Sequence, residues 1–191
     1  MMTITGEHLW KSYGGTEVLR DVSLTVTESQ PVCLMAPSGS GKTTLLRLMM
    51  GLERPDRGRV TASEDLRWAA VFQEDRLLEQ LSAMGNLRFA LGPGLKEDQA
   101  RGLLEELGLG DVGDKSVRDY SGGMKRRLAL VRALLSPAGA LALDEPFTGL
   151  DAHSREQCLG AVRRLAEGRI LLLASHNADD APALGARVET L

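Results

Sequence analysis

Hydrophobic residues gather in short runs along this chain, and polar residues, glycine or proline separate the runs. Residues 32–35, 68–72, 140–143 and 170–174 form such runs, and each has the length of one β-strand. Continuous runs of this kind are typical of strands buried on both faces of a parallel sheet. Residues 22–26 alternate hydrophobic and polar side chains instead, which indicates a strand with one exposed face.

Other segments show hydrophobic residues at helical spacing. Residues 97–107 begin with acidic side chains, carry leucines three or four positions apart and are followed by Gly108. This pattern indicates a helix with one buried face and a glycine stop. We expect further helices over residues 45–50, 124–135 and 152–167. Buried strands separated by helices predict an α/β fold with a mainly parallel sheet.

The order of the expected strands and helices along the chain predicts a single domain in which a helical part is inserted into a sheet-containing part. Short candidate strands at residues 3–5, 8–11 and 22–26 indicate a small N-terminal antiparallel β region, whereas residues 74–137 are helical and more charged. We therefore expect a core subdomain over about 1–75 and 137–191 and a helical subdomain over about 76–136. A chain of 191 residues is long enough to bury a substantial core.

Composition narrows the classes of partner. The 23 lysine and arginine residues against 26 acidic ones give a net charge of -3, and aromatic residues make up only 4% of the chain. Neither a basic groove nor base-stacking platforms are expected, so we predict no nucleic-acid partner. No hydrophobic stretch is long enough to span a bilayer, and two cysteines do not form a disulfide framework. We expect a soluble, cytoplasmic chain that reaches a membrane only through a partner.

A phosphate-binding loop is predicted directly after the strand at residues 32–35. The loop lies between that strand and a helix, which is the context that such a motif requires. Its backbone N–H groups and the helix N-terminus favour a polyphosphate. The predicted ATP-binding residues are Ala36, Pro37, Ser38, Gly39, Ser40, Gly41, Lys42, Thr43 and Thr44.

Two side chains of this loop have specific expected roles, and one position departs from the motif. Lys42 can reach the outer phosphates, and the Thr43 hydroxyl can bind Mg²⁺. Ala36 stands where the pattern GxxxxGK[ST] has its first glycine. Because alanine is the smallest replacement, we expect a modest effect on loop geometry. The alternative is a turn rich in serine and glycine with a chance lysine.

Acidic and basic side chains follow two of the other buried strands. Asp144 and Glu145 come directly after one strand and His176 after another. Alternation along a strand separates neighbouring side chains, so we expect Asp144 to bind Mg²⁺ with Thr43 and Glu145 to activate a water molecule. His176 could donate a hydrogen bond to a γ-phosphate. The alternatives are a solvated acidic turn and a structural histidine.

The sequence Tyr120-Ser-Gly-Gly-Met124 resembles the LSGGQ signature of ATP-binding cassette (ABC) ATPases. Other motifs of that family occur in the same order, including residues 36–44 as the Walker A loop and 141–145 as Walker B. The resemblance also identifies Tyr13 as an adenine-stacking aromatic, Gln73 as the Q-loop residue that joins Thr43 and Asp144 at the metal, Asp151 as part of the D-loop and His176 as the switch histidine. Without the family, Tyr13 would be a turn residue that packs on its own sheet.

The resemblance implies a function and an assembly. An ABC ATPase of this kind hydrolyses ATP with Mg²⁺, Glu145 and His176 being catalytic, and powers an integral membrane permease at the inner face of the membrane. Two cassettes, identical or different, would enclose ATP head to tail. The signature residues of one cassette would contact the nucleotide of the other; they are Ser121, Gly122, Gly123 and Met124. Free N–H groups at the start of a helix suit that role.

Several alternatives remain open at this point. Ser-Gly-Gly before a helix is also an ordinary cap and turn, and the basic run at residues 125–127 is by default a solvated helix face. Met124 replaces the usual glutamine, as in branches that resemble nitrate, sulfonate and taurine importers. A soluble ABC ATPase without a permease, or a cassette that binds ATP without hydrolysing it, would share most of these motifs.

Overall fold

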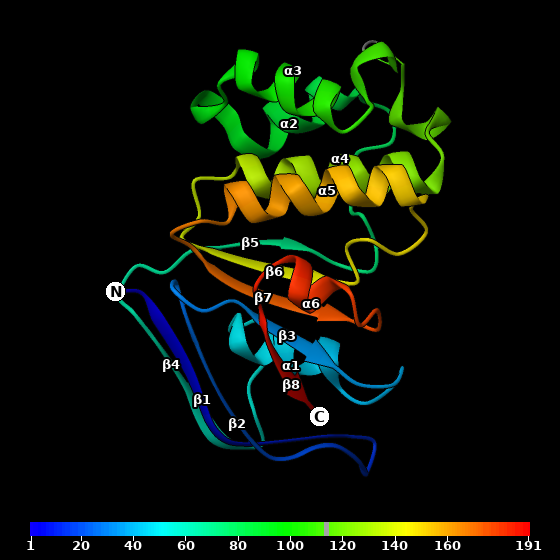
Figure 1. Cartoon of the computed structure of the whole chain (residues 1–191). Helices are drawn as coiled ribbons and strands as arrows, with labels where there is room; N and C mark the ends of the chain where they lie inside the picture. Colours follow the sequence, from blue (N-terminus) through cyan, green and yellow to red (C-terminus); the bar gives the residue numbers. More distant parts are fainter. Residues whose placement is uncertain (113–114) are drawn as a thin grey trace. The chain divides into compact units, whose positions relative to one another are not determined.

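The structure is a computed structural model that describes residues 1–112 and 115–191, and the chain divides into two compact units (Figure 1). The sheet unit comprises Met1–Ala70, Ala138–Glu145 and Ala166–Leu191. The helical unit comprises Val71–Pro137 and Pro146–Leu165. The predicted α/β class with an N-terminal antiparallel region is confirmed.

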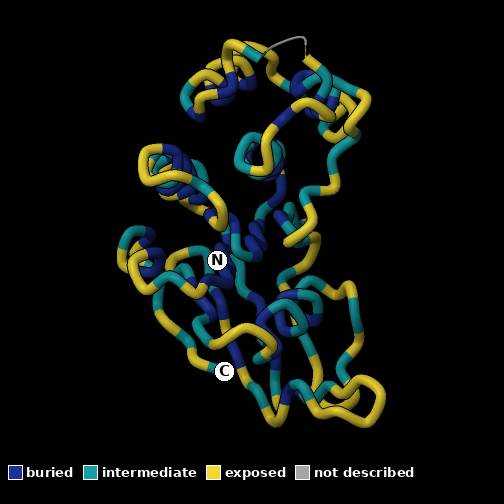
Figure 2. Tube along the Cα trace, turned by 90° about the vertical axis from the view of Figure 1, so that its right-hand side faces the viewer, coloured by how far each residue is buried: buried dark blue, intermediate teal, exposed yellow. Residues whose placement is uncertain are grey.

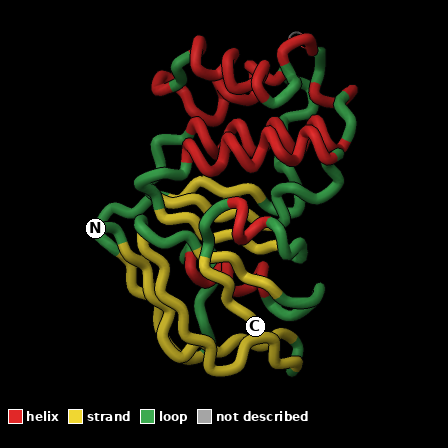
Figure 3. The backbone as a smooth tube through the Cα atoms, in the orientation of Figure 1, coloured by secondary structure: helices red, strands yellow, loops and turns green. Residues whose placement is uncertain are grey.

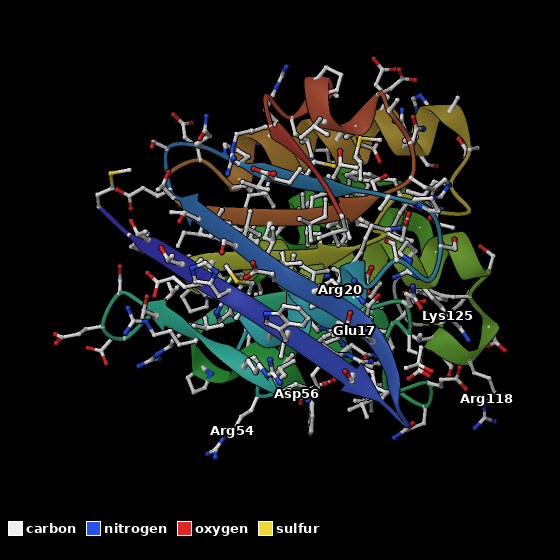
Figure 4. All side chains as sticks on the ribbon, turned by 90° about the horizontal axis from the view of Figure 1, so that it is seen from below. Glu17, Arg20, Arg54, Asp56, Arg118 and Lys125 are labelled. Atoms are coloured by element: carbon white, nitrogen blue, oxygen red, sulfur yellow. The ribbon has the colours of Figure 1, made fainter. Side chains whose placement is uncertain are left out.

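An antiparallel sheet with strand order β2-β1-β4 begins the sheet unit. Its strands are β1 (Thr3–Tyr13), β2 (Thr16–Thr27) and β4 (Arg57–Ala62). The two strands predicted at residues 3–5 and 8–11 are one strand, whose register shifts between Gly6 and Leu9. His8 has a φ of 51° at this irregularity, and its ring lies 2.7 Å from Asp21. At the hairpin end of β2, Glu17 and Arg20 form an exposed ion pair (Figure 4).

The second sheet has the strand order β5-β6-β7-β3-β8. Its strands are β3 (Val32–Met35), β5 (Trp68–Val71), β6 (Ala140–Asp144), β7 (Ile170–Ser175) and β8 (Arg187–Thr190). Strand β7 pairs in parallel with both β3 and β6, with Met35 opposite Ser175 and Asp144 opposite Ala174. The loops that leave these three strands therefore start at the same edge of the sheet. Every residue of β6 and β7 is buried, whereas β4 is largely exposed (Figure 2).

Helices α1 (Lys42–Met49) and α6 (Asp180–Ala183) complete the sheet unit. Leu45 and Leu48 of α1 are fully buried in a core that also contains Ile4, Leu34 and Leu172. Because α1 is anchored by its hydrophobic face, its N-terminal turn is held beside the edge where β3 ends. The predicted bounds of the strands and of this helix differ from the observed ones by a few residues, while α6 and β8 were not predicted.

The helical unit contains α2 (Ala83–Leu91), α3 (Glu97–Glu106), α4 (Gly122–Leu135) and α5 (Ala152–Leu165), with short 3-10 turns at Gly92–Gly94, Gly110–Val112 and Val117–Asp119 (Figure 3). Helix α5 groups with this unit, although the sequence placed it in the core, because it packs on α4 and because Arg164 pairs with Glu106 of α3. The subdomain predicted over 76–136 includes residues 113–114, which lie outside the described residues. None of the helices in the described part of the chain has the length and hydrophobicity needed to cross a membrane.

Candidate nucleotide site

The predicted phosphate-binding loop leaves β3 and ends at the first turn of α1. Gly39 and Gly41 have φ values of 83° and 96°, a region in which L side chains are strained. A Cβ at Gly41 would also lie 2.8 Å from Leu19 Cδ2 and 3.0 Å from the Val18 carbonyl oxygen. Ala36 is not among the residues with positive φ, so its backbone does not require glycine. The departure from the motif at Ala36 is therefore compatible with the observed loop.

Lys42 lies inside the curve of this loop. Its side chain is buried, and its Nζ donates hydrogen bonds to the carbonyl oxygens of Ala36 at 2.6 Å and Pro37 at 3.2 Å. Ser40 Oγ is buried and has no hydrogen-bond partner among the described residues. A buried cation and a buried hydroxyl without a partner, both close to a helix N-terminus, fit a phosphate group.

The structure brings Thr43 and Asp144 together across 101 positions of sequence. Thr43 Oγ1 donates a hydrogen bond of 2.6 Å to Asp144 Oδ2. Asp144 is only 2% exposed, and burial raises its pKa, while the bond from Thr43 acts in the opposite direction. Asp144 Oδ1 is buried without a hydrogen-bond partner in the described part of the chain. Hard oxygen donors of this type suit Mg²⁺, which binds proteins through few side chains and keeps phosphate and water ligands.

The predicted catalytic pair is also brought together. His176 Nδ1 lies 2.7 Å from Glu145 Oε2, and the His176 side chain is 62% exposed whereas that of Glu145 is 16% exposed. Glu145 has a φ of 50°, and its N–H donates to the Ala174 carbonyl oxygen at 2.9 Å. A glutamate in this rare backbone region is held there by its surroundings, as is common at active sites.

A buried network beside His176 was not predicted. Ser175 Oγ donates a hydrogen bond of 2.5 Å to Asp180 Oδ2, and the Asn177 N–H donates to Ser175 Oγ at 3.0 Å. Asp180 is only 2% exposed. These bonds join both chain neighbours of His176 to the start of α6. The sequence signal was a polar run at the end of a buried strand, which by itself does not indicate a network.

Tyr13 lies at the end of β1 and is 44% exposed. Its hydroxyl donates to the Glu53 carboxylate, and Lys11 Nζ lies 5.5 Å from the ring centroid. Burial and the Glu53 carboxylate raise the pKa of Tyr13, and a hydrogen bond with Thr44 lowers it. The ring is therefore held beside the first turn of α1. Its role in stacking on adenine stays a prediction.

The predicted signature and D-loop residues lie in the helical unit. Ser121 caps α4, because its Oγ accepts a hydrogen bond from the Met124 N–H at 3.2 Å. A Cβ built at Gly123 would lie 3.5 Å from the Gly149 carbonyl oxygen, so the signature adjoins the D-loop. Asp151 caps α5 by accepting from the Ser154 N–H at 2.9 Å. Both motifs therefore have a clear structural role, and their contacts with nucleotide stay predictions.

Gln73 follows β5 in the helical unit, and its role at the metal stays a prediction. Its carbonyl oxygen accepts a hydrogen bond of 2.7 Å from Arg126 of α4. The expectation that residues 125–127 form a solvated helix face is wrong for Arg126, whose side chain is 12% exposed. The same holds in part for Arg127, which donates to the Leu107 carbonyl oxygen at 2.7 Å. Sequence reasoning missed these contacts because carbonyl acceptors leave no mark in the side-chain pattern.

In the described residues, no group of three or more histidine, cysteine, aspartate or glutamate side chains could hold a metal ion. A metal here would therefore depend on Thr43, Asp144 and the phosphates of a nucleotide. The geometry brings a phosphate-binding loop, a candidate Mg²⁺ pair and a carboxylate–histidine pair to one sheet edge. Such a set can bind a nucleoside triphosphate and direct a water molecule at its terminal phosphate.

Comparison with known proteins agrees with this chemistry. A family model described as ABC transporter matches residues 19–148. An aliphatic sulfonates import ATP-binding protein SsuB 1 of Pseudomonas savastanoi pv. phaseolicola is 39% identical over 180 residues, which cover 93% of this chain and 76% of that protein. The SsuB 1 of Rhizobium johnstonii is 38% identical over 204 residues, which cover 100% of this chain and 73% of that protein. The SsuB of Delftia acidovorans is 38% identical over 184 residues, which cover 95% and 76%.

Proposed function

This chain belongs to the ABC transporter family and is an ATP-binding subunit that hydrolyses ATP to energise transport; from that premise we propose how its residues act. The observation that carries the proposal is the convergence of the Lys42 loop, the Thr43–Asp144 pair and the Glu145–His176 pair on one sheet edge. Each of these groups has a separate task in phosphoryl transfer.

Lys42 holds the loop carbonyls of Ala36 and Pro37 until phosphate oxygens replace them as acceptors. Thr43, Asp144 and Gln73 would hold Mg²⁺, which neutralises charge on the phosphates when it is bound. Glu145 accepts the proton of the attacking water. His176 orients the Glu145 carboxylate through their 2.7 Å contact, and its exposed ring would donate a hydrogen bond to the γ-phosphate.

Two cassettes would close head to tail, so that Ser121, Gly122 and Gly123 of one contact the nucleotide bound by the other. The support within this chain is the exposed N-terminal turn of α4, whose first N–H groups have no acceptor within the helix. ATP binding would close the pair and hydrolysis would reopen it. That movement would drive a permease, so the chain would act peripherally at the inner face of the membrane.

The proposed cargo is a small organic sulfonate that is imported. The support is that the relatives named above are import proteins for aliphatic sulfonates and cover most of this chain. Met124 in the signature agrees with that branch. Uptake of an alkanesulfonate by vesicles that contain this chain and its permease is the direct assay, and uptake of a different class of solute alone would overturn the assignment.

Phosphate release from the purified chain tests the proposed chemistry. With Mg²⁺ and ATP, activity should rise more than proportionally with protein concentration, because each site needs two cassettes. Glu145→Gln should abolish turnover, retain ATP binding and stabilise the dimer. Ready turnover by this variant would contradict the role of Glu145. A wild-type activity strictly proportional to concentration from a monomer would contradict the shared site.

A further inference from the structure

Two arginines of α4 hold the backbone of residues 72–76, which we term the Gln73 segment. Arg126 donates from Nη1 to the Phe72 carbonyl oxygen at 2.5 Å and from Nη2 to that of Gln73 at 2.7 Å. Arg132 donates from Nη2 to the Asp75 carbonyl oxygen at 2.8 Å and from Nη1 to that of Arg76 at 2.6 Å. Each guanidinium therefore bridges two consecutive carbonyl groups, which matches its planar array of donors.

The spacing of these contacts shows that the Gln73 segment runs along α4 in the same direction as the helix. Six positions separate the two arginines, which corresponds to about 9 Å of helix. The two carbonyl pairs are three positions apart, a separation that three residues span even with the bends at residues 73 and 74, since an extended chain would cover about 10 Å. Both arginines hold the segment at once in this structure. Residues 72–76 have no place in a helix or strand, and the arginines supply partners that regular structure would otherwise give.

Asp75 adds a charge contact to this attachment. Its Oδ1 lies 3.2 Å from Arg126 Nη1, and the two side chains are 20% and 12% exposed. Burial raises the pKa of Asp75, whereas the charges of Arg126, Arg132 and Lys125 lower it. Burial likewise lowers the pKa of Arg132. Removing one partner from such a desolvated set leaves charge and carbonyl groups uncompensated, which is costly.

We propose that Arg126 and Arg132 are positioning residues that fasten the Gln73 segment to α4, so that Gln73 and the signature turn move as one body. The inference rests on the proposed head-to-tail function and extends it. Ser121, which begins the signature turn, is the N-cap of the same helix, five positions before Arg126. A displacement of Gln73 toward nucleotide or permease is thereby transmitted to the turn that meets the second nucleotide. The attachment of the Gln73 segment to α4 would therefore link the two ATP sites of a dimer.

The test uses the full chain in a Glu145→Gln background, in which ATP should hold the dimer closed. Arg126→Gln should leave the affinity of the monomer for ATP within about twofold, because the Lys42 loop and the Thr43–Asp144 pair belong to the sheet unit, whereas Arg126 belongs to the helical unit. It should weaken ATP-dependent dimerisation about tenfold, measured by sedimentation. Hydrogen exchange at the amides of residues 73–76 should become at least about tenfold faster.

Two matched variants separate positioning from general loss of structure. Arg126→Lys keeps the charge beside Asp75 but has no planar fork, so we expect a defect between those of wild type and Arg126→Gln. Arg164→Gln removes an arginine of the same unit that pairs with the Glu106 carboxylate and not with the Gln73 segment. It should leave both readouts unchanged.

The outcomes are distinguishable from a failure of the proposed function. If Glu145→Gln alone forms no ATP-dependent dimer, the head-to-tail function fails. If that dimer forms and Arg126→Gln leaves its affinity and the local exchange unchanged, the fastening role is wrong. If Arg126→Lys behaves like the wild type, a positive charge alone is sufficient, and the proposed role of the planar guanidinium is wrong. Should Arg126→Gln not fold, Arg126→Lys and Arg132→Lys give the same comparison.

Discussion

Replacing Ala36 by glycine would restore the residue that the phosphate-loop motif usually has, and we expect it to weaken the protein without improving the site. The backbone of Ala36 does not have a positive φ, so glycine brings no relief of strain. The functional atom at this position is the carbonyl oxygen that accepts from Lys42 Nζ at 2.6 Å, and the substitution leaves it unchanged. What changes is the freedom of the unfolded chain.

The expected magnitude follows from that freedom. Glycine in place of alanine at an unstrained position costs about 0.4–1 kcal/mol of folding free energy. For a chain of this size 1 kcal/mol corresponds to about 2–4 °C in the midpoint of thermal unfolding. We therefore expect Ala36→Gly to lower the midpoint by about 1–4 °C and to change ATP affinity by less than about twofold. Calorimetry of the nucleotide-free chain and an ATP titration measure the two quantities.

Gly41→Ala is the control for this argument, because Gly41 has a positive φ and Ala36 does not. A side chain at a φ of 96° costs about 1–2 kcal/mol before any contact is counted. Its Cβ would also lie 3.0 Å from the Val18 carbonyl oxygen, which is backbone and cannot rotate away. This variant should lose more stability than Ala36→Gly and bind ATP poorly. If Ala36→Gly instead binds ATP tenfold more tightly, or if both variants behave alike, the assignment of glycine-requiring positions is wrong.

Three further predictions concern single side chains of the site. Lys42→Ala should weaken ATP binding by about 10–150-fold, since a charge-assisted hydrogen bond contributes about 1.5–3 kcal/mol, and unchanged affinity in a titration would contradict the loop assignment. Asp144→Asn should abolish hydrolysis yet stabilise the nucleotide-free chain near neutral pH. Because burial raises the pKa of Asp144, the folded state binds that proton more tightly than the unfolded state does, so wild-type stability falls as pH rises from the unfolded pKa to the folded pKa. The stability difference between the two proteins in thermal melts should grow over this range; a constant difference would refute the burial argument. Tyr13→Phe should retain ATP affinity and Tyr13→Ala should lose about 2–10-fold, as expected for a ring contact of about 0.5–1.5 kcal/mol, and equal affinities in a titration would argue against stacking.

The strands and the phosphate loop could be predicted because their signals are local. Residues 140–143 and 170–174 are unbroken hydrophobic runs, and the glycine and lysine spacing after β3 is a property of a few adjacent residues. Helix α2 was harder, since the sequence there showed only a helical tendency without defined ends. Strand β8 alternates half-buried and exposed residues at a sheet edge, and four residues are too few for a pattern to stand out.

Contacts that depend on tertiary structure could not be predicted in the same way. Arg126 lies in a basic run on a helix, and such a run is exposed in most proteins. Its partners are carbonyl oxygens more than 50 positions earlier, as the sequence separations of 53 and 54 show. A carbonyl is present at every residue, so no sequence pattern marks those at residues 72 and 73. Only the packing of α4 against the chain decides which ones the arginine meets.

The signature turn shows a second limit of prediction from sequence, because the same residues are suited both to capping a helix and to binding a phosphate. Ser121 accepts a hydrogen bond from the Met124 N–H, which is what an N-cap does in any helix. The same turn leaves early N–H groups available to an anion, which is what the proposed partner nucleotide needs. A cap and a phosphate contact therefore depend on the same residues. What separates the two roles is the dependence of dimerisation on ATP, because a cap stabilises the single chain whereas a phosphate contact stabilises only the pair.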